Sequence, residues 1–401
     1  MSKERLSDVV AVLESGSRPK GGVQEGSEGV LSLGAEHLDG GGGFDFSKAK
    51  RIPKDYFNQM KKGRIARDDI LVVKDGATTG KTSFVGVTFP DEPAAVNEHV
   101  FIVRVDRSRA FPAYVFRYLR SPRGQLQVLS DFRGATVGGV SRGFVDRVKI
   151  PLPLLPEQWR IAAILDKADA VRRKRQQTLK LADQFLRSAF LNMFGAATSS
   201  EYPSVPLDDV CTKITDGAHQ TPTYREEGVP FLRVTDIQSR GIKWNNVKRI
   251  SREEHEDLTK RCLPERGDVL YSKNGTIGIP KLVNWDQLFS MFVSLALLKP
   301  DRTKLRGAFL ESFLATPLAL RQATMHSKTL TVTNLHLVEI RKIRMPLPPL
   351  HIQDEWLRLK REITRAASRY ADVLGEAVLL FESLTQRAFR GELSASGRGK
   401  P

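Results

Sequence analysis

The feature that most constrains this chain is an internal repeat. The segment Ile150-Pro151-Leu152-Pro153-Leu154-Leu155 returns 195 residues later as Met345-Pro346-Leu347-Pro348-Pro349-Leu350. In the same way, Lys74-Asp75-Gly76 returns as Lys273-Asn274-Gly275. Repeats of this kind are read before any other pattern because they fix the architecture. The chain is therefore expected to contain two copies of one domain related by an internal pseudo-two-fold arrangement, which suits a ligand that is itself made of two parts.

The composition indicates which class of molecule the chain binds. The chain has 401 residues, a net charge of +17 and a sequence pI near 9.9, and so strong a basic excess is typical of proteins that bind nucleic acid. No stretch approaches the roughly 20 apolar residues that a membrane span needs. The two cysteines, Cys211 and Cys262, lie far apart and predict neither a disulfide framework nor a zinc site. We expect a cytoplasmic protein without a membrane partner.

The repeat and its punctuation predict an α+β fold, in which two similar α/β domains are joined by two long helices. The expected segments are a first domain over 1–152, a first long spacer helix over 153–200, a second domain over 201–347, a second spacer helix over 348–393 and a disordered tail over 394–401. The two long helices have no other equivalent partners in the chain. Because a whole domain lies between them, they are expected to pair as an antiparallel coiled coil.

Apolar or small residues at steps of three and four define a predicted seam on each long helix. On the first helix the seam comprises Ile161, Ile164, Ala168, Val171, Ala182, Phe185 and Ala189. On the second it comprises Trp356, Leu359, Ile363, Ala366, Tyr370, Val373, Ala377, Leu380 and Leu384. At ~1.5 Å per residue the first helix would extend roughly 58 Å, long enough to span more than one DNA turn of ~34–36 Å.

The sequence contains two partial matches to catalytic motifs, and neither match is complete. The stretch from Asp75 to Thr82 resembles a phosphate-binding loop, but Asp75 stands where the first glycine is required and the repeat copy has no lysine after Gly278. The match Gly139-Val140-Ser141-Arg142-Gly143 lacks the strand and helix that a nucleophile elbow needs. The seven histidines have no metal-ligand spacing. We expect no catalytic residue, no metal and no cofactor in this chain.

Polar and basic loops recur at matching places in the two halves, where they could bind phosphates and read base edges. The alternatives are ordinary turn chemistry for these loops and a solvated helix face for the basic run Arg172–Arg175. The residues predicted in this way to contact DNA are Thr78, Thr79, Lys81, Arg133, Thr136, Ser141 and Arg142 in the first half, and Thr276, Lys328, Thr329, Thr331, Thr333 and Asn334 in the second.

The order of domain, helix, domain and helix, with a proline motif before each helix, resembles the specificity subunit of type I restriction-modification systems. Pro156-Glu157-Gln158 follows the first motif, whereas Ile352-Gln353 follows the second. The segment Asp216-Gly217-Ala218-His219-Gln220-Thr221-Pro222 looks like the entry of that family's target recognition domains, and Gly16-Ser17-Arg18-Pro19 is a degraded equivalent. The resemblance adds to the expected DNA contacts the residues Arg18, Lys74, Asp75, His219, Gln220, Lys273 and Asn274.

The resemblance implies a non-catalytic subunit that reads a bipartite sequence in double-stranded DNA, one half per recognition domain. It also implies that the chain docks two methyltransferase (modification) subunits and the restriction subunits, which are translocase-nucleases. S-adenosylmethionine and ATP would then belong to those partners. Two alternatives remain at this point, namely the specificity subunit of a related bifunctional restriction-methylation enzyme and a coiled-coil scaffold protein without a DNA role.

Overall fold

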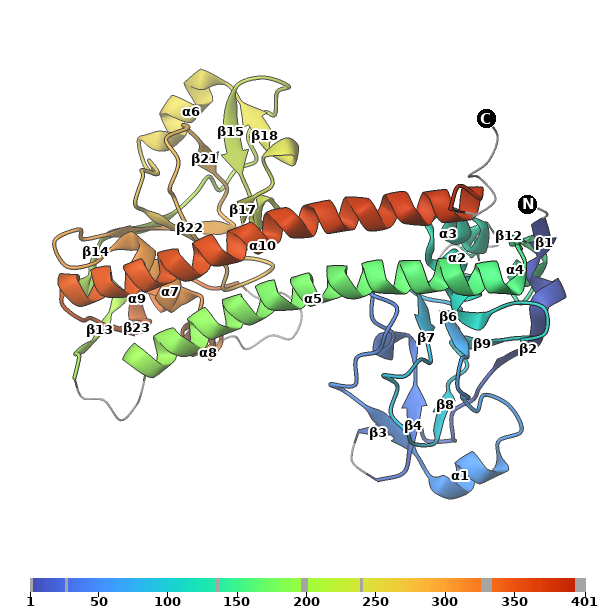
Figure 1. Ribbon diagram of the computed structural model, residues 1–401. Coiled ribbons are helices and arrows are strands. Elements are labelled where there is room, and N and C mark those ends of the chain that lie inside the picture. Colours follow the sequence, from blue (N-terminus) through green and yellow to red (C-terminus); the bar gives the residue numbers. More distant parts are fainter. Residues whose placement is uncertain are drawn as a thin grey trace. The chain divides into compact units, whose positions relative to one another are not determined.

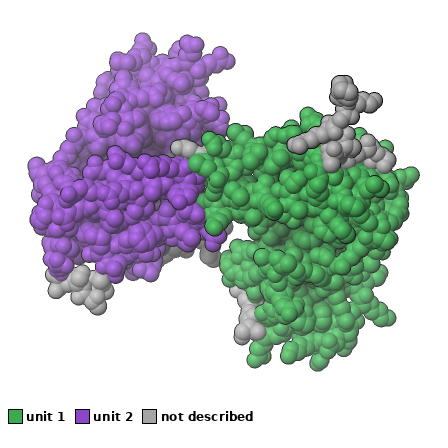
Figure 2. Space-filling model, in the orientation of Figure 1, with its two compact units in different colours: residues 1–176, 372–401 green, residues 177–371 purple. Residues whose placement is uncertain are grey.

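The computed structural model describes residues 3–25, 28–130, 132–134, 138–195, 201–238, 241–325 and 334–393 (Figure 1). The predicted tail 394–401 therefore lies outside the described residues. The chain divides into two compact units, residues 1–176 with 372–401 and residues 177–371 (Figure 2). Each unit contains one of the two expected domains together with one part of each long helix.

Unit 1 is built on two four-stranded sheets with strand orders β2-β9-β6-β7 and β3-β5-β4-β8. The first sheet is antiparallel, whereas the second contains the parallel pair β4 and β8. Their strands are β2 (Val10–Ser15), β3 (Gln24–Glu25), β4 (Val30–Leu33), β5 (Lys50–Ile52), β6 (Ile70–Val73), β7 (Thr82–Phe84), β8 (Ala94–Val96) and β9 (Val100–Val105).

Helices and short strands complete unit 1. Two small pairs, β1 with β12 and β10 with β11, lie outside the main sheets. These elements are β1 (Lys3–Arg5), η1 (Leu6–Val9), η2 (Ala35–His37), α1 (Lys54–Gln59), α2 (Pro112–Arg120), α3 (Pro122–Leu129), β10 (Phe132–Arg133), β11 (Gly139–Val140), α4 (Phe144–Arg147) and β12 (Lys149–Pro151).

The strand β6 explains how the layers stack. Its alternate side chains point to opposite faces of the sheet. Ile70 and Val72 join the core under α2 and α4, whereas Leu71 and Val73 join the core shared with β4 and β8. All four residues are buried, which is why the strand has no polar alternation. The sheet thus lies between a helical layer and a second sheet.

Unit 2 repeats this plan. Its antiparallel sheet has the order β14-β22-β19-β20, and its second sheet has the order β18-β15-β21 with a parallel pair β15 and β21. Its elements are β13 (Ser204–Pro206), η3 (Leu207–Asp209), β14 (Cys211–Asp216), β15 (Val229–Leu232), η4 (Val234–Asp236), β16 (Ile237–Gln238), β17 (Gly241–Ile242), η5 (Trp244–Asn246), β18 (Lys248–Ile250), α6 (Arg252–Thr259), β19 (Val269–Ser272), β20 (Pro280–Leu282), β21 (Ser290–Met291), β22 (Leu295–Pro300), α7 (Gly307–Leu314), α8 (Pro317–Thr324), α9 (Leu337–Lys342) and β23 (Arg344–Pro346).

The shared topology confirms the predicted α+β fold with two similar domains. A buried glutamine ties each domain to its helix in the same way. The side chain of Gln158 accepts from the Phe111 amide at 2.8 Å and donates to Pro153 O at 2.8 Å. Gln353 accepts from the Arg306 amide at 2.9 Å and donates to Pro348 O at 2.8 Å. The glutamine that the two proline motifs share therefore links the start of the helix to the domain body.

The two long helices are α5 (Leu155–Phe194) and α10 (Leu350–Arg390). They run antiparallel within each unit, as predicted. In unit 1, the Arg172 guanidinium lies 5.6 Å from the centre of the Phe381 ring, and Arg175 Nη1 donates to Val373 O at 2.7 Å. In unit 2, the aromatic ring centres of Phe190 and Trp356 lie 5.2 Å apart.

The predicted seams are partly wrong. Val171 and Phe185 on α5 are 46% and 57% exposed, and Tyr370 and Leu380 on α10 are 52% and 57% exposed. The buried or partly buried positions on the last part of α10 are Leu374, Ala377, Val378, Phe381, Leu384, Thr385, Ala388 and Phe389. The shift arises because the helices pack against the domain bodies as well as against each other, which turns a different face inward.

Candidate nucleic-acid interface

The turn after β6 carries half of the predicted DNA contacts of unit 1, and backbone hydrogen bonds join it to the hairpin β10–β11. The Val140 amide donates to Lys74 O at 2.8 Å, and the Gly76 amide donates to Gly138 O at 3.1 Å. Asp75 forms a β-bridge with Gly139, which in turn faces Arg133 across the hairpin. Lys74, Asp75 and Arg133 are therefore brought to one edge of the unit, although they are far apart in sequence.

A charged network extends this edge to the entry segment. Arg18 Nε donates to Glu98 Oε1 at 2.7 Å, and Arg18 Nη2 lies 2.5 Å from His99 Nε2. The other ring nitrogen, His99 Nδ1, lies 2.6 Å from Asp75 Oδ1. The hydrogen bond from Arg18 holds the pKa of the Glu98 carboxyl below its usual range. Arg18 and Asp75, both predicted sites, are thus linked through two residues that sequence reasoning missed.

The remaining predicted residues of unit 1 have varied environments. Thr78 is exposed, and Thr79 Oγ1 donates to Gly76 O at 2.7 Å. The Ser141 hydroxyl accepts from the Gly143 amide at 3.2 Å, and the Arg142 guanidinium donates to Leu13 O. Lys81 lies apart from the cluster, because its ammonium donates to Leu38 O at 2.9 Å and Ala35 O at 3.3 Å. Lys81 therefore caps the carbonyls around η2.

Unit 2 repeats the backbone arrangement with different side chains. The Leu335 amide donates to Lys273 O at 2.8 Å, and Asn274 forms a β-bridge with Asn334. The side-chain oxygen Asn274 Oδ1 is buried and has no hydrogen-bond partner within the described residues. Thr276 and Asn334 are exposed. The predicted sites Lys273, Asn274, Thr276 and Asn334 are thus adjacent through this bridge.

Asp216 is the centre of the charged network in unit 2. Lys273 Nζ lies 3.3 Å from Asp216 Oδ2, and His219 Nε2 lies 3.1 Å from Asp216 Oδ1. Arg261, which sequence reasoning missed, donates to Asp216 O at 3.0 Å. Lys273 is buried, whereas the side chain of Lys74 is 38% exposed. His219 and the neighbouring Gln220 are both exposed.

Equivalent backbone positions therefore carry different side chains in the two units. Lys74 N bonds to His99 O, and Lys273 N bonds to Ser294 O, so a histidine in unit 1 replaces a serine in unit 2. Glu98 and His99 were missed because they have no counterpart in the repeat on which the prediction was based. The predicted sites Thr136, Lys328, Thr329, Thr331 and Thr333 lie outside the described residues.

The described residues give little support to a metal site, a nucleophilic cysteine or a membrane-spanning helix. No group of three or more histidines, cysteines or acidic residues is arranged to hold a metal ion in the described part of the chain. Burial raises the pKa of the Cys211 thiol to about 12 and that of Cys262 to about 11, so neither is activated as a nucleophile. Among the described helices, none is both long enough and apolar enough to cross a membrane.

Comparison with known proteins gives consistent matches. The model of the type I restriction modification DNA specificity domain matches residues 2–181 and 199–359. The specificity subunit of the type I restriction enzyme EcoBI of Escherichia coli is 24% identical over 86% of this chain and 78% of its own length. That of EcoKI from Escherichia coli strain K12 is 24% identical over 90% of this chain and 82% of its own length.

Solved structures agree on the fold. The crystal structure of a type I restriction-modification S subunit from M. genitalium aligns with a TM-score of 0.54 at 13% identity, covering 97% of this chain and 96% of that chain. A chain from a structural study of complex assembly and conformational transition of the type I R-M system aligns with a TM-score of 0.51 at 20% identity, covering 98% of both chains.

Proposed function

Because the chain belongs to the family of type I restriction modification DNA specificity domains, we propose that it reads a bipartite sequence in double-stranded DNA, one half-site per unit. The observation that carries this proposal is the repeated backbone arrangement that holds Lys74 and Asp75 in unit 1 and Lys273 and Asn274 in unit 2. One scaffold presenting different side chains suits two half-sites of different sequence. The net charge of +17 supports contact with the phosphate backbone.

In unit 1, the proposed readers are Arg18, Lys74, Asp75, Thr78 and Arg133. Glu98 and His99 would act as positioning residues, since both contact Arg18 and His99 also contacts Asp75. Arginine and lysine side chains pair with guanine, and amides pair with adenine. In unit 2, His219, Gln220, Asn274, Thr276 and Asn334 offer a different set of donors and acceptors. This difference favours an asymmetric DNA target.

The partners follow from the family. We propose that the chain docks two methyltransferase subunits and that restriction subunits join the complex. S-adenosylmethionine and ATP would be bound by those partners, and this chain would contribute recognition without catalysis. The purified chain is therefore expected neither to methylate DNA nor to hydrolyse ATP, and methyl transfer or ATP turnover by the chain alone would contradict this assignment. The identity of the subunit that co-purifies would distinguish this assembly from a bifunctional restriction-methylation enzyme.

The bipartite reading is tested by exchanging loops. Residues 74–80 and 138–142 would be replaced by those of another family member, and the methylated sequence determined by methylome sequencing in cells that carry the partner genes. We expect one half of the recognised sequence to change and the other to remain. The matched control replaces 273–278 and should change the other half only. A single exchange that altered both halves would overturn the assignment of one reader per unit.

A further inference from the structure

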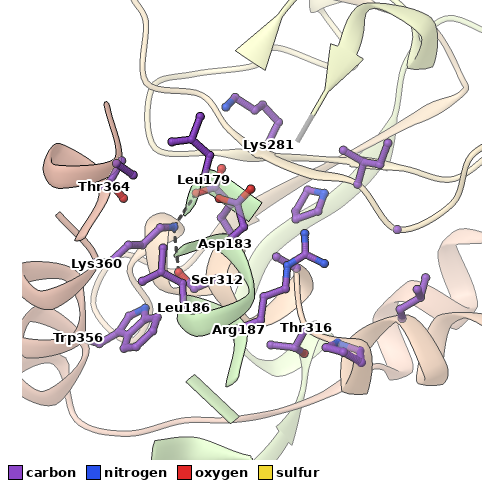
Figure 3. A pocket seen from close by; sticks show the side chains of 18 of the residues that line it. Leu179, Asp183, Leu186, Arg187, Lys281, Ser312, Thr316, Trp356, Lys360 and Thr364 are labelled. Carbon is purple, nitrogen blue, oxygen red and sulfur yellow. Dashed lines mark hydrogen bonds and ion pairs between the residues drawn. The ribbon is translucent and has the colours of Figure 1, made fainter. Parts of the chain in front are cut away.

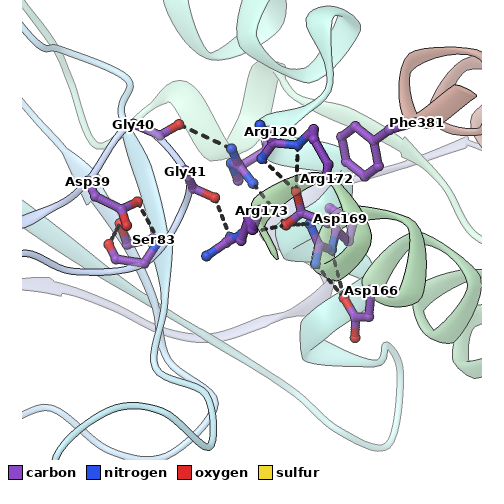
Figure 4. A network of polar contacts seen from close by, with 12 residues as sticks. Asp39, Gly40, Gly41, Ser83, Arg120, Asp166, Asp169, Arg172, Arg173 and Phe381 are labelled. Atoms are coloured by element: carbon purple, nitrogen blue, oxygen red, sulfur yellow. Dashed lines mark hydrogen bonds and ion pairs between the residues drawn. The ribbon is translucent and has the colours of Figure 1, made fainter. Parts of the chain in front are cut away.

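The two units differ at one equivalent place, where α2 in unit 1 and α7 in unit 2 meet the long helices. In unit 1, this place is filled by arginines around the buried carboxylate of Asp169 on α5 (Figure 4). Arg117 Nη1 donates to Asp169 Oδ2 at 2.8 Å, and Arg172 Nη2 donates to Asp169 Oδ1 at 2.6 Å. Arg120 and Arg173 donate to the carbonyls of Gly40 and Gly41 in a loop of the same unit. Side chains and loop together occupy the space.

In unit 2, small residues stand at the corresponding positions, 195 residues later. Arg117, Arg120, Asp169, Arg172 and Arg173 correspond to Ser312, Ala315, Thr364, Ala367 and Ser368. All five small residues line a single pocket with a volume of about 630 Å³ (Figure 3). The cavity thus lies where unit 2 has small residues in place of the larger side chains of unit 1. Its volume is in the range of sites that bind small organic molecules.

Two polar atoms in or behind the wall of the pocket are unpaired among the described residues. Trp356 lines it and is 1% exposed, and its indole Nε1 has no hydrogen-bond partner within the described residues. The buried hydroxyl of Tyr271, beside the lining residue Gly278, also lacks one there. Buried polar groups of this kind are usually satisfied, so the wall of this pocket is less completely paired than an ordinary core, although neither atom is itself exposed to the cavity.

The charges of the lining favour an anion. Lys360 Nζ is held by Glu311 Oε2 at 2.9 Å and by Ser312 Oγ at 2.9 Å. Arg187, Lys281 and the carboxylate of Asp183 also line the pocket, and the charge of Lys281 helps to lower the pKa of the Glu311 carboxyl. Leu179, Leu186 and Leu320 supply apolar walls. The lining therefore carries three cations, Arg187, Lys281 and Lys360, against the two carboxylates Asp183 and Glu311, beside an apolar surface.

We propose that this pocket of unit 2 binds a small anionic amphiphile, a molecule with a compact apolar body and one carboxylate or similar acidic group. The apolar body lies against the leucines and Trp356, and the acidic group accepts from Arg187 or Lys281. The pocket is built from α5, α7, α8, α10, β20 and the end of the β19–β20 turn at Gly278 and Ile279, whereas the candidate DNA contacts Lys273, Asn274 and Thr276 of that turn do not line it. In unit 1 the arginine cluster fills the equivalent place.

The test uses the full chain and naphthalene-2-carboxylate as the probe, with its neutral analogue naphthalene-2-carboxamide, in isothermal titration calorimetry. We expect one saturable site per chain that prefers the carboxylate. Ala367→Arg restores the residue type of unit 1 inside the pocket and should lower affinity at least tenfold, on the order expected for overfilling a cavity. The matched control is Ala366→Arg, which places the same side chain on an exposed neighbouring position outside the pocket and should bind as the wild type does.

A second variant guards against misfolding of the first. Arg187→Gln removes the positive charge but leaves a polar side chain that can donate a hydrogen bond, and it should reduce the preference for carboxylate over carboxamide about tenfold. Equal loss of binding in Ala366→Arg and Ala367→Arg, or equal affinity for the two probes, would overturn the proposal. Displacement of the bound probe by an added methyltransferase subunit would also overturn it, since the pocket would then be a protein docking site. Intact DNA binding by Ala367→Arg separates any failure here from a failure of the proposed function.

Discussion

Lysines that match in the repeat have different environments. The buried carboxylate of Asp216 neutralises Lys273. In unit 1 the position equivalent to Asp216 is Ser15, because Ser15 lies opposite Phe101 on β9 just as Asp216 lies opposite Ala296 on β22. Without that carboxylate, Lys74 Nζ lies 5.9 Å from the centre of the Phe101 ring and stays partly exposed. The repeat predicted which backbone positions recur, but the neighbouring strand decides whether the ammonium is available to a phosphate.

Lys74 and Lys81 should respond differently to removal of the ammonium. Lys74→Ala should weaken DNA binding and reduce the slope of log affinity against log salt by about 1, as the loss of one phosphate contact would. Lys81→Ala should instead lower the free energy of unfolding by about 1–2 kcal/mol, because two carbonyls lose their charged donor. DNA titrations at several salt concentrations and urea unfolding measure the two effects. A Lys81→Ala variant with wild-type stability and a flatter salt slope would contradict this assignment.

Gly217 shows why the entry segment requires glycine. A Cβ at this position would lie 2.0 Å from Met291 O, and at the equivalent Gly16 it would lie 1.7 Å from Val96 O. Gly217→Ala should therefore cost about 1–3 kcal/mol of stability through overpacking. The control is Gly241→Ala, where no atom of the described residues lies within 4 Å of the added Cβ. Urea unfolding should separate the two variants, and equal midpoints would show that the backbone can move aside.

At the scale of elements, the strands and long helices were largely predictable, and the helix faces were not. The apolar runs at β6 and β9 and the uninterrupted stretch after Pro156 lie in the elements that they predict. The predicted seam failed at Tyr370 and Leu380 because spacing alone cannot say which face meets a domain body. Likewise, Asp169 looks like a solvated helix residue in sequence, yet it is 1% exposed and surrounded by arginines.

The Asp169 cluster should make the docking of α2 on α5 sensitive to acid. Burial by itself would raise the pKa of the Asp169 carboxyl, but hydrogen bonds and charges from Arg117, Arg172 and Arg173 outweigh it and lower the pKa to about 2. Because this value lies below the ordinary 3.8, the stabilisation is complete above about pH 4 and is lost as the pH falls towards 2.

Asp169→Asn should lower the free energy of unfolding at pH 7 by about 3 kcal/mol, because Arg117 is 8% exposed and would lose a buried partner. The control is Asp166→Asn, whose carboxylate also pairs with Arg117 but is 52% exposed and should cost less than about 1 kcal/mol. Urea unfolding between pH 7 and pH 3 measures both variants. The difference between wild type and Asp169→Asn should shrink as the pH falls, and a constant difference would show that the loss reflects packing rather than charge.

For the whole molecule, the repeat predicted the two-domain plan because it records the shared backbone. The candidate site was less predictable, since Glu98, His99 and Arg261 enter it from segments where the two units differ. Such residues have no partner in the repeat and no local motif, and only the folded chain brings them beside Arg18 or Asp216. Recognition residues that differ between the halves are the ones that an argument from internal similarity cannot find.

Both long helices continue without a break through the boundaries between the units, α5 after Gln176 and α10 after Ala371. If they act as a ruler, one added heptad in each helix at these boundaries should keep the pairing faces in phase. Seven residues lengthen a helix by roughly 10 Å at ~1.5 Å per residue. The non-specific gap between the half-sites should then grow by about three base pairs at ~3.4 Å each, with both half-site sequences unchanged.

Methylome sequencing of cells carrying the variant and its partner genes reads the gap directly. As a control, a heptad added to α5 alone puts the pairing out of register and should abolish methylation, whereas an active double insertion with an unchanged gap would refute the ruler role.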